Sequence, residues 1–487
     1  MDNKDIPWEM VVGLEIHVQI NSKSKAFCSD QNLFIDEPNR FISPITLAHP
    51  GTLPRYNEYH IESAVKLGSA FGSKINEINY FDRKNYFYPD LPKGYQITQD
   101  EKPICTGGKF SFPTGDGSIK TLRIHHIHME EDAGKSIHDQ HPEKTFLDFN
   151  RAGVPLLEIV TEPELYHPDE VYYCIHHMQM LVRYLGISDG NMEEGSFRCD
   201  CNVSVKRKNE SELGVRCEIK NLNSKKFARN AVEFEKDRQI KLIEDGGSVK
   251  KTTLLFDSAT GKTFPMRDKE EVNDYRYFND PDLPPVMLTK EYIERIKAQM
   301  LVTPFEWYTK LTTDYGLTVK EAEILIENKA CILLLEKMIN SGAGIRESVL
   351  LIINKVVPSL QITDERLFDQ DKVVNRLCEF ISIIEDGTVS KSVAYQFLFD
   401  ELVRKHFDID LTDLAHNLGL IQTSDMHRIN EWVKEVLDKN PDKVEEYRKG
   451  KKNLMGFFMG QIMRISGGKA NPNQVQSTVI EFLKHPH

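Results

Sequence analysis

The chain has 487 residues, of which 40% are hydrophobic and 28% charged, and its formal net charge is −12 from 62 Lys and Arg against 74 Asp and Glu. This length predicts two to four domains, because a single core does not grow to such a size. The acidic balance argues against a general nucleic-acid binder, and no run of about 18 apolar residues indicates a membrane span. The N-terminus lacks an apolar signal core and the 8 Cys are irregularly spaced, so we expect a cytoplasmic protein with reduced thiols.

Residues 1–290 have the pattern of a β-rich domain. Short runs that alternate apolar and polar residues are separated by Gly, Pro and Asn, for example at 11–20, 121–130 and 201–208. One segment in this half, 169–186, has helical spacing of its apolar residues and ends at a glycine. The pattern therefore predicts an α+β fold and not a βαβ repeat, and a proline cluster at 281–285 marks the end of the domain.

The segment 13–20, GLEIHVQI, has the period of two that is typical of a strand. Its polar side chains would share one face, and they are Glu15, His17 and Gln19. Carboxylate and imidazole are ligands of divalent cations, so a metal or substrate site is one interpretation. A plain polar sheet face is the other.

The stretch 81–99 gathers charged and aromatic residues before two prolines. They are Asp82, Arg83, Lys84, Tyr86, Tyr88 and Asp90. The pattern is typical both of an aromatic-anchored loop and of a binding site.

Carboxylates concentrate in two segments farther along the chain. Glu130, Glu131 and Asp132 are consecutive, and such neighbours repel one another unless solvent or a cation neutralises them. Glu158 lies inside an apolar run at 154–160, where a carboxylate is costly unless it pairs with a basic residue or binds a metal. A solvated turn and an ion pair remain open as the alternatives to ligands.

Basic groups lie close to further carboxylates. Arg151 lies in a glycine-containing turn, Arg198 and Asp200 follow Gly195-Ser196, and Lys220 lies in a segment that alternates like a strand. Carboxylates combined with Arg and Lys suit a nucleotide–metal site, in which cations bridge phosphates and basic groups hold them. Cys199 and Cys201 have no C-x-x-C partner, so we interpret them as thiols on a strand.

Several common motifs are missing. No Walker loop or dinucleotide fingerprint is present, so a common nucleotide-binding fold is not expected. No Ser-His-Asp or Cys-His nucleophile arrangement is visible. In the run at 125–128, alternation would place His126 and His128 on one face and His125 on the other.

From residue 291 the pattern becomes helical. Thr318 and Glu321 form a capping box, and helical spacing continues behind it to Met338. A further helix is predicted at 390–407. The tail, 431–475, predicts a helix, a proline-started helix, an apolar helix and a Gly-Gly turn. A basic edge before the apolar helix, with one lysine after the turn, suits a phosphate backbone or a solvated helix end; these residues are Arg448, Lys449, Lys451, Lys452 and Lys469.

Eight segments in this order resemble the GatB family, the B subunits of the glutamyl-tRNA(Gln)/aspartyl-tRNA(Asn) amidotransferases. They are GLEIHVQI, FDRKNYFYPDLPKGYQITQ, HMEEDAGKSIHD, DFNRAGVPLLEIVTEP, MEEGSFRCDCNVSV, EIKNLNS, MRDKEEVNDYRYFNDPDLPP and MGFFMGQIMRISGGKANP. The similarity runs from about residue 8 to the C-terminus. It implies an antiparallel-sheet cradle domain at 1–290, an all-α helical domain at 291–408 and a YqeY-like tRNA-binding tail at 409–487.

The resemblance also implies an activity. The family uses ATP to phosphorylate the side-chain carboxylate of Glu or Asp esterified to tRNA, and ammonia then displaces the phosphate to give Gln-tRNA(Gln) or Asn-tRNA(Asn). A separate glutaminase (the A subunit) supplies the ammonia through a channel, and the small C subunit ties the two into a heterotrimer. The missing glutaminase nucleophile agrees with this division of labour.

Residue roles follow from position in the matched motifs. The family's catalytic metal ligands, for which we expect Mg²⁺, match Glu15, His17, Glu131 and Glu158. The candidates for the ATP site are Arg151, Arg198, Asp200 and Lys220, and Lys84 and Tyr88 are expected to border the ammonia entrance. Many members carry a four-cysteine zinc knuckle, but the region 27–54 has only Cys28, so we expect no structural zinc.

Two other functions fit the same residues. A freestanding metal-dependent phosphoryl-transfer enzyme would turn over ATP on a small substrate without partners. A catalytically silent tRNA-binding scaffold would retain transamidation after Glu131→Ala and would depend on the basic tail alone. The location of the carboxylates inside the matched motifs favours the amidotransferase.

Overall fold

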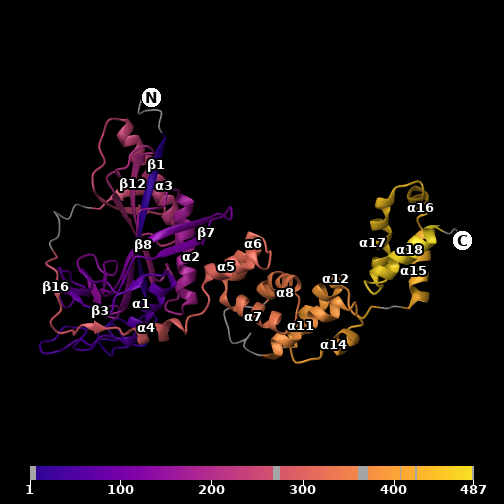
Figure 1. Ribbon diagram of the computed structural model, residues 1–487, viewed down its shortest axis with the longest axis horizontal. Coiled ribbons are helices and arrows are strands. Elements are labelled where there is room, and N and C mark those ends of the chain that lie inside the picture. The colour runs from indigo at the N-terminus through magenta and orange to yellow at the C-terminus, as the bar shows by residue number, and fades with distance from the viewer. Residues whose placement is uncertain (1–6, 267–274, 360–370, 406, 423–424, 485–487) are drawn as a thin grey trace. The chain divides into compact units, whose positions relative to one another are not determined.

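The computed structural model describes residues 7–266, 275–359, 371–405, 407–422 and 425–484, and the chain divides into two compact units, 1–309 and 310–487 (Figure 1). The first unit combines a large sheet with helices and the second is helical, which confirms the predicted α+β class. The three-domain division stays a prediction. Within the matched motif at 266–285, residues 267–274 lie outside the described part of the chain.

A ten-stranded sheet forms the centre of the first unit. Its four central strands are β12 (Phe197–Arg207), β1 (Trp8–Gln19), β11 (Pro155–Thr161) and β8 (Ile119–Glu131), and neighbours in this order are antiparallel. Beyond β12 follow β13 (Cys217–Lys220), β14 (Thr253–Asp257) and β15 (Lys262–Pro265). Beyond β8 follow β6 (Cys105–Thr106) and β2 (Lys74–Ile75), and β7 (Lys109–Pro113) also pairs with β8. The pair β13–β14 is parallel.

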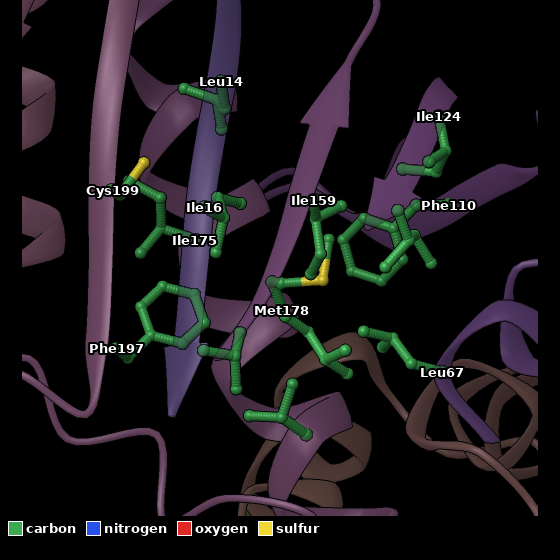
Figure 2. Packing of buried hydrophobic residues seen from close by; sticks show 14 of the residues in the cluster. Leu14, Ile16, Leu67, Phe110, Ile124, Ile159, Ile175, Met178, Phe197 and Cys199 are labelled. Carbon is green, nitrogen blue, oxygen red and sulfur yellow. The ribbon is translucent and has the colours of Figure 1, made fainter. Parts of the chain in front are cut away.

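Three helices cover one face of this sheet. They are α1 (Glu58–Ala70), α2 (Pro168–Tyr184) and α3 (Lys225–Glu244), and Asn57, His167 and Ser224 cap their first turns. Figure 2 shows the core beneath them, where Leu14 and Ile16 of β1 and Ile159 of β11 meet Ile175 and Met178 of α2. Alternate residues of the strands form this core because successive side chains of a strand point to opposite faces.

The sequence predicted one helix before residue 290, and this was incomplete. α2 is present, but α1 and α3 are helices as well, and α4 (Lys290–Lys297) begins where the helical pattern was predicted to start. The signal for α3 was available, since Ser224 is a good N-cap and Ala228, Ala231 and Val232 follow helical spacing. The many charged residues on the other face of α3 made its composition similar to that of the neighbouring loops, so the helix was not recognised.

Smaller sheets flank the main one. β4 (Asp82–Asn85) lies between β5 (Tyr95–Thr98) and β16 (Phe278–Asn279), so part of the stretch 81–99 is a strand and not a loop. The two remaining pairs are β3 (Ile78–Asn79) with β17 (Val286–Met287), and β9 (Lys135–Ile137) with β10 (Phe146–Asp148). Arg83 of β4 pairs with Asp280 at 2.8 Å and with Asp282 at 2.7 Å, and these contacts tie the segment after β16 to β4.

The second unit begins within α5 (Pro304–Thr313) and continues with α6 (Val319–Glu327) and α7 (Lys329–Asn340). The predicted capping box of Thr318 and Glu321 is present, but the predicted helix breaks at Asn328, whose backbone is extended and whose side chain caps α7. The following elements are α8 (Ile345–Leu351), η2 (Ile352–Val356), α9 (Val357–Ser359), α11 (Asp371–Glu385), α12 (Lys391–Val393), η3 (Ala394–Leu398), α13 (Phe399–Arg404) and α14 (Leu411–Asn417). Helical residues 391–404 confirm most of the helix predicted at 390–407, and residue 406 lies outside the described residues.

The tail forms the predicted succession of helices. They are α15 (Met426–Asp438), α16 (Pro441–Arg448), η4 (Lys452–Leu454), α17 (Met455–Ile465) and α18 (Pro472–Lys484), with the turn Gly467–Gly468 after α17. Ile429, Val433, Phe458, Ile462 and Val479 are fully buried in a core of their own. None of the helices in the described ranges is long and apolar enough to cross a membrane.

Candidate functional site

Four side chains form one row across the face of the sheet that the helices leave uncovered. Arg198 of β12 is opposite His17 of β1, His17 is opposite Glu158 of β11, and Glu158 is opposite His128 of β8. Residues directly opposite one another in antiparallel strands have neighbouring side chains on the same face. Segments far apart in the sequence therefore contribute to one polar row.

The two imidazoles of this row cluster with its carboxylate, Glu158, and with Glu130, which lies two residues after His128 on the same face of β8. His17 Nε2 lies 3.3 Å from Glu158 Oε2 and 3.6 Å from Glu130 Oε1. His128 Nε2 lies 3.0 Å from Glu158 Oε2 and 3.6 Å from Glu130 Oε2. Ligand atoms of His17, Glu130 and Glu158 all lie within 4.8 Å of one another. One nitrogen and two carboxylate oxygens converging in this way suit Mg²⁺ or Mn²⁺.

The charges of the cluster depend on one another. Burial disfavours a charged His128, but the carboxylates of Glu158 and Glu130 outweigh burial and raise its pKa to about 10. Burial likewise opposes charge on His17, and the hydrogen bond and charge of Glu158 still raise its pKa. Burial would raise the pKa of Glu158, but His128 and then His17 hold it well below its usual range. A protonated His128 therefore balances the carboxylates, and Glu158 shifts the pKa of His17 in the same direction.

Glu15, a predicted ligand, lies on the same face but outside this group. It is opposite Asp200, and its carboxylate accepts a hydrogen bond from Asn202 Nδ2 at 2.8 Å. Burial and the charge of Glu158 raise the pKa of Glu15. Glu15 lies two residues before His17 on β1, and from there its carboxylate contributes to the electrostatics of the cluster.

Glu131, another predicted ligand, has partners of its own. Its Oε1 accepts a hydrogen bond from the Ile97 amide at 3.0 Å and pairs with Lys93 Nζ. The side chain is buried away from the cluster that contains Glu130. The structure thus brings His17 and Glu158 together with Glu130, while the predicted set of four ligands stays a prediction.

Arg198 borders the cluster and offers a donor for an anion. Its Nη2 lies 3.1 Å from Asp132 Oδ2, and its buried Nε has no hydrogen-bond acceptor among the described residues. Asp132 also accepts from Gln19 Nε2 at 3.0 Å. Burial would raise the pKa of Asp132, but Arg198 and Arg151 lower it. An unsatisfied guanidinium N–H beside carboxylates that can bind a cation suits a metal-bound phosphate.

Arg151 and Lys220 are more fully engaged. Arg151 donates to the carbonyls of Ala133 and Gly134 at 3.0 and 2.7 Å, so it holds the turn after Asp132. Lys220 Nζ lies 2.9 Å from Asp200 Oδ2 and 2.8 Å from Glu218 Oε1. Burial opposes its charge, but these carboxylates raise the pKa of Lys220, so it stays a cation.

One cavity of about 250 Å³ unites most of these groups. Its lining consists of His17, Tyr86, Gln96, Glu130, Asp132, Ala133, Leu156, Arg198, Asp200 and Lys220. A larger cavity of about 660 Å³ lies against α2 and contains none of the predicted site residues. We take the smaller cavity as the candidate site because it combines the carboxylates, the imidazole and the basic groups.

The two residues expected at the ammonia entrance lie on the segment of Tyr86. Lys84 Nζ is 4.8 Å from the ring centroid of Tyr275 and 6.0 Å from that of Tyr86. Tyr88 is 42% exposed. A second cavity, of about 110 Å³, is lined by Phe27, Lys93, Glu131 and Asp132 among others. Asp132 lines both cavities.

Three residues of this site were not predicted as site residues from the sequence. Glu130, His128 and Asp132 were noted there, but none was placed among the ligands or the phosphate contacts. The signal for Glu130 was its phase in the strand, because alternation from His126 and His128 leads to Glu130 and not to Glu131. The role of Asp132 had no comparable signal, since it depends on two arginines from other segments.

The basic tail residues contact their own helices. Lys449 and Lys451 pair with Glu445 and Glu446, each at 3.1 Å, and Arg448 Nε donates to the Leu483 carbonyl at 3.1 Å. Lys452 Nζ lies 4.2 Å from the centroid of Tyr447. Such exposed pairs contribute little stability and exchange partners readily, so the basic edge remains available to an anionic partner.

Comparisons with known proteins agree with this geometry. Residues 10–294 match the family model of the GatB/GatE catalytic domain, and residues 333–483 match that of the GatB domain. The chain is 44% identical over 479 residues to the B subunit of the aspartyl/glutamyl-tRNA(Asn/Gln) amidotransferase of Rickettsia bellii, covering 98% of each chain. It is 42% identical to the protein of the same name from Thermodesulfovibrio yellowstonii, covering 98% of this chain and 99% of the relative. The Persephonella marina protein is 40% identical over 98% of this chain and 100% of its own length.

Proposed function

Because the chain belongs to the GatB/GatE family, together with the B subunits of aspartyl/glutamyl-tRNA amidotransferases, we propose that it activates the side-chain carboxylate of Glu-tRNA(Gln), of Asp-tRNA(Asn), or of both. The observation that supports this role best is the cluster of His17, Glu130 and Glu158. Two of its members, His17 and Glu130, line one cavity together with Arg198, whose Nε is unsatisfied. Family membership makes the reaction a carbon–nitrogen ligation.

The chemistry requires activation because a carboxylate is a poor acyl electrophile. In the first step a side-chain oxygen of the aminoacyl group bonds to the γ-phosphorus of ATP, the bond from that phosphorus to the bridging oxygen breaks, and ADP leaves. In the second step ammonia bonds to the carbonyl carbon, the bond to the phosphate oxygen breaks, and phosphate leaves with its electron pair. The nitrogen then loses one proton.

The residues of the cavity fit these steps. His17, Glu130 and Glu158 would hold Mg²⁺, which when bound neutralises charge on the phosphoryl oxygens. Arg198 would orient a phosphate oxygen through its unsatisfied N–H. His128 keeps Glu158 ionised, and Lys220 lowers the net negative charge around Asp200 and Glu218. Glu15, two residues before His17 on β1, would adjust the affinity of the cluster for Mg²⁺ through its charge.

The ammonia route would reach this cavity through the second one. The two cavities share Asp132, and the second one is also lined by Glu131 and Lys93, which pair with each other. Gln96 Nε2 donates to the Glu131 carbonyl at 2.8 Å and lines the catalytic cavity. We place the final barrier to ammonia at Glu131 and Lys93.

Partners and location follow from the same proposal. The ammonia source would be a separate glutaminase, and a small third protein would complete the heterotrimer. The tail helices, with their basic edge, would bind the tRNA body. Aminoacyl-tRNA and eight free cysteines suit the cytoplasm, and we expect no structural zinc because Cys28 Sγ contacts Thr46 Oγ1 at 3.4 Å and no other cysteine occurs in its loop.

The test is single-turnover conversion of Glu-tRNA(Gln) and of Asp-tRNA(Asn) by this chain assembled with the glutaminase and the small third protein. ATP, Mg²⁺ and ammonium chloride are supplied, so the glutaminase reaction is bypassed. We expect conversion by the wild type and a loss of at least about 10³-fold in Glu158→Gln, since the cation loses a charged ligand.

Glu164→Gln provides the control. Glu164 pairs with Arg123 at 2.6 Å on the surface of the same unit, and it lines neither cavity. Equal rates in wild type and Glu158→Gln would overturn the catalytic assignment and favour a tRNA-binding scaffold. Conversion of neither tRNA by the wild type would overturn the proposed function itself.

A further inference from the structure

Three tyrosines form an aromatic wall beside the catalytic cavity, defined here as Tyr86, Tyr275 and Tyr277. The ring centroids of Tyr86 and Tyr275 are 6.1 Å apart, and those of Tyr275 and Tyr277 are 5.9 Å apart. Tyr86 follows β4 directly, and the other two lead into β16, which pairs with β4 and is labelled in Figure 1. The wall is therefore built at one end of this small sheet by two segments that are far apart in the sequence.

The backbone holds the wall in place. The Asn85 amide donates to the Tyr275 carbonyl at 2.9 Å, and Asn85 Nδ2 donates to the Arg276 carbonyl at 2.8 Å. Arg276 has a positive φ of 44°, a conformation that turns the chain between Tyr275 and Tyr277. The two tyrosines are thereby presented by a turn that is bonded to β4.

The wall reaches from the cavity to solvent. Tyr86 lines the cavity that contains His17 and Glu130. Burial first, and then neighbouring charges that include Glu130, raise the pKa of both Tyr86 and Tyr277, which agrees with their nearness to the cluster. Tyr277 is nevertheless 40% exposed, so its ring also meets the solvent.

A lysine stands against the same rings. Lys84 Nζ lies 4.8 Å from the centroid of Tyr275, and Lys84 forms no ion pair within the ranges that the structure describes. Its ammonium group therefore keeps donors for an anion beside the exposed end of the wall. A row of aromatic faces with an adjacent cation is the arrangement by which proteins bind single-stranded nucleic acid, with bases stacked on the rings and phosphates near the cation.

We propose that the aromatic wall binds the 3′-terminal nucleoside of the aminoacylated RNA, with its base against Tyr277 and Tyr275 and its phosphate near Lys84. This inference rests on the proposed function, because the aminoacyl group is esterified to the ribose of that nucleoside. Binding the base on the wall sets the aminoacyl side chain at the mouth of the cavity, next to the cluster of His17, Glu130 and Glu158.

Two substrates carry an adenosine that the wall could bind: ATP and the 3′ end of the tRNA. The exposure of the wall favours the tRNA. The adenine of ATP is a small ligand that an enclosed pocket would surround. The end of a tRNA arrives from solvent while the rest of the molecule stays outside, so it needs a platform that is open on one side. Tyr277 lies at the solvent-exposed side of the wall, and Tyr86 lies at the side that lines the cavity.

The first measurement is equilibrium binding to the assembled complex of an RNA acceptor hairpin that ends in CCA, compared with the same hairpin lacking the terminal base. The wild type should bind the complete hairpin about tenfold more tightly, which is the lower range for stacking of one base. Tyr277→Leu keeps an apolar side chain without the aromatic face, and it should abolish this difference. Tyr277→Phe should retain it.

Tyr166→Leu is the matched control. Tyr166 is 44% exposed, and Lys120 Nζ lies 4.6 Å from its ring centroid, so it reproduces the exposure and the cation of the wall at another place in the same unit. This variant should bind both hairpins like the wild type. Because the assay detects binding alone, it yields a result even where the complex converts neither aminoacyl-tRNA.

The second measurement separates the two adenosine sources by steady-state kinetics. Tyr277→Leu should raise KM for Glu-tRNA about tenfold and leave KM for ATP unchanged, while Tyr277→Phe restores the wild-type values. A rise in KM for ATP alone would assign the wall to the nucleotide and overturn the proposal. The proposal would also be overturned if Tyr277→Leu still bound the complete hairpin more tightly than the hairpin without the terminal base, by the same factor as the wild type.

Discussion

The two faces of the ten-stranded sheet differ in nearly every physical property although the same strands form both. On the face beneath α1, α2 and α3, alternate residues such as Ile16, Ile159 and Phe197 are fully buried in apolar contacts. On the other face, the residues between them are His17, Glu158 and Arg198, joined by charge. The comparison teaches that one period-two pattern supplies both the stability and the chemistry, and that each can be altered separately.

The histidines on the two faces show the same contrast. His60 of α1 is buried against the apolar side, where its Nε2 lies 2.8 Å from the Leu156 carbonyl, and burial lowers its pKa to about 4. His128 is equally buried, but the carboxylates raise its pKa to about 10. Burial alone thus favours a neutral imidazole, and neighbouring charge reverses its effect.

The largest effect should come from the polar face. His17→Gln removes the imidazole from the cluster, so the rate of amide formation by the assembled complex should fall about 10⁴-fold, or roughly 5 kcal/mol. The free energy of unfolding should change by less than about 2 kcal/mol, because the apolar face is untouched. Single-turnover kinetics and urea unfolding measure the two quantities. A loss of folding in proportion to the loss of rate would show that the two faces do not have separate roles.

Phe197→Ala probes the apolar face. The ring is fully buried, and its removal should lower the free energy of unfolding by about 4 kcal/mol through lost burial and a cavity. Activity per folded molecule should stay within about threefold, since Arg198 on the same strand points to the other face. Urea unfolding and active-site titration test both parts, and a variant that is stable but inactive would contradict the division of roles.

The pH dependence sharpens the contrast between the histidines. Unfolded His60 binds a proton near pH 6.5 but folded His60 only near pH 4, so the unfolded state binds more protons between these values and stability falls as the pH falls from 6.5 to 4. The contribution reaches about 3 kcal/mol. Urea unfolding at several pH values should show a shallower decline for His60→Gln than for the wild type. If the free energy of unfolding fell equally with pH in the wild type and in His60→Gln, His60 would not be the cause of the decline.

The smallest effect distinguishes two neighbouring carboxylates. Glu130→Gln should weaken Mn²⁺ binding about 30-fold, because Glu130 belongs to the group of converging ligand atoms. Glu131→Gln, its matched control, should change the affinity less than about threefold, because that carboxylate is held by Lys93 and the Ile97 amide. Calorimetric titration with Mn²⁺ measures both. The reverse order of effects would restore Glu131 as the ligand.

Much of the fold followed from residue patterns. The period of two located β1 and the shared face of Glu15, His17 and Gln19, and Glu158 proved to be a carboxylate in a buried strand with charged partners. The capping box at Thr318 and the tail helices were also visible. These features depend on neighbours within a few positions, which a single sequence contains.

The rest of the site depends on pairings that a single sequence does not show. Alternation along β8 places Glu130, and not Glu131, on the face of His128, but only the pairing of β8 with β11 and of β11 with β1 brings that face to His17. The Asp132 contacts require Arg151 and Arg198 to meet from separate segments. The helix break at Asn328 is different, because its cause is local: the Asn328 side chain accepts a hydrogen bond from the Ala330 amide and starts a new helix.

The position of β1 at the centre of the sheet has a consequence for synthesis on the ribosome. β1 is made first, but its two neighbours are β11 and β12, which end at Thr161 and Arg207. At elongation rates of about 5–20 residues per second, the strand waits roughly 10 to 40 seconds for its last partner. During that interval the nascent chain carries an unpaired apolar strand, so we expect early chaperone contact and a folding rate limited by long-range pairing.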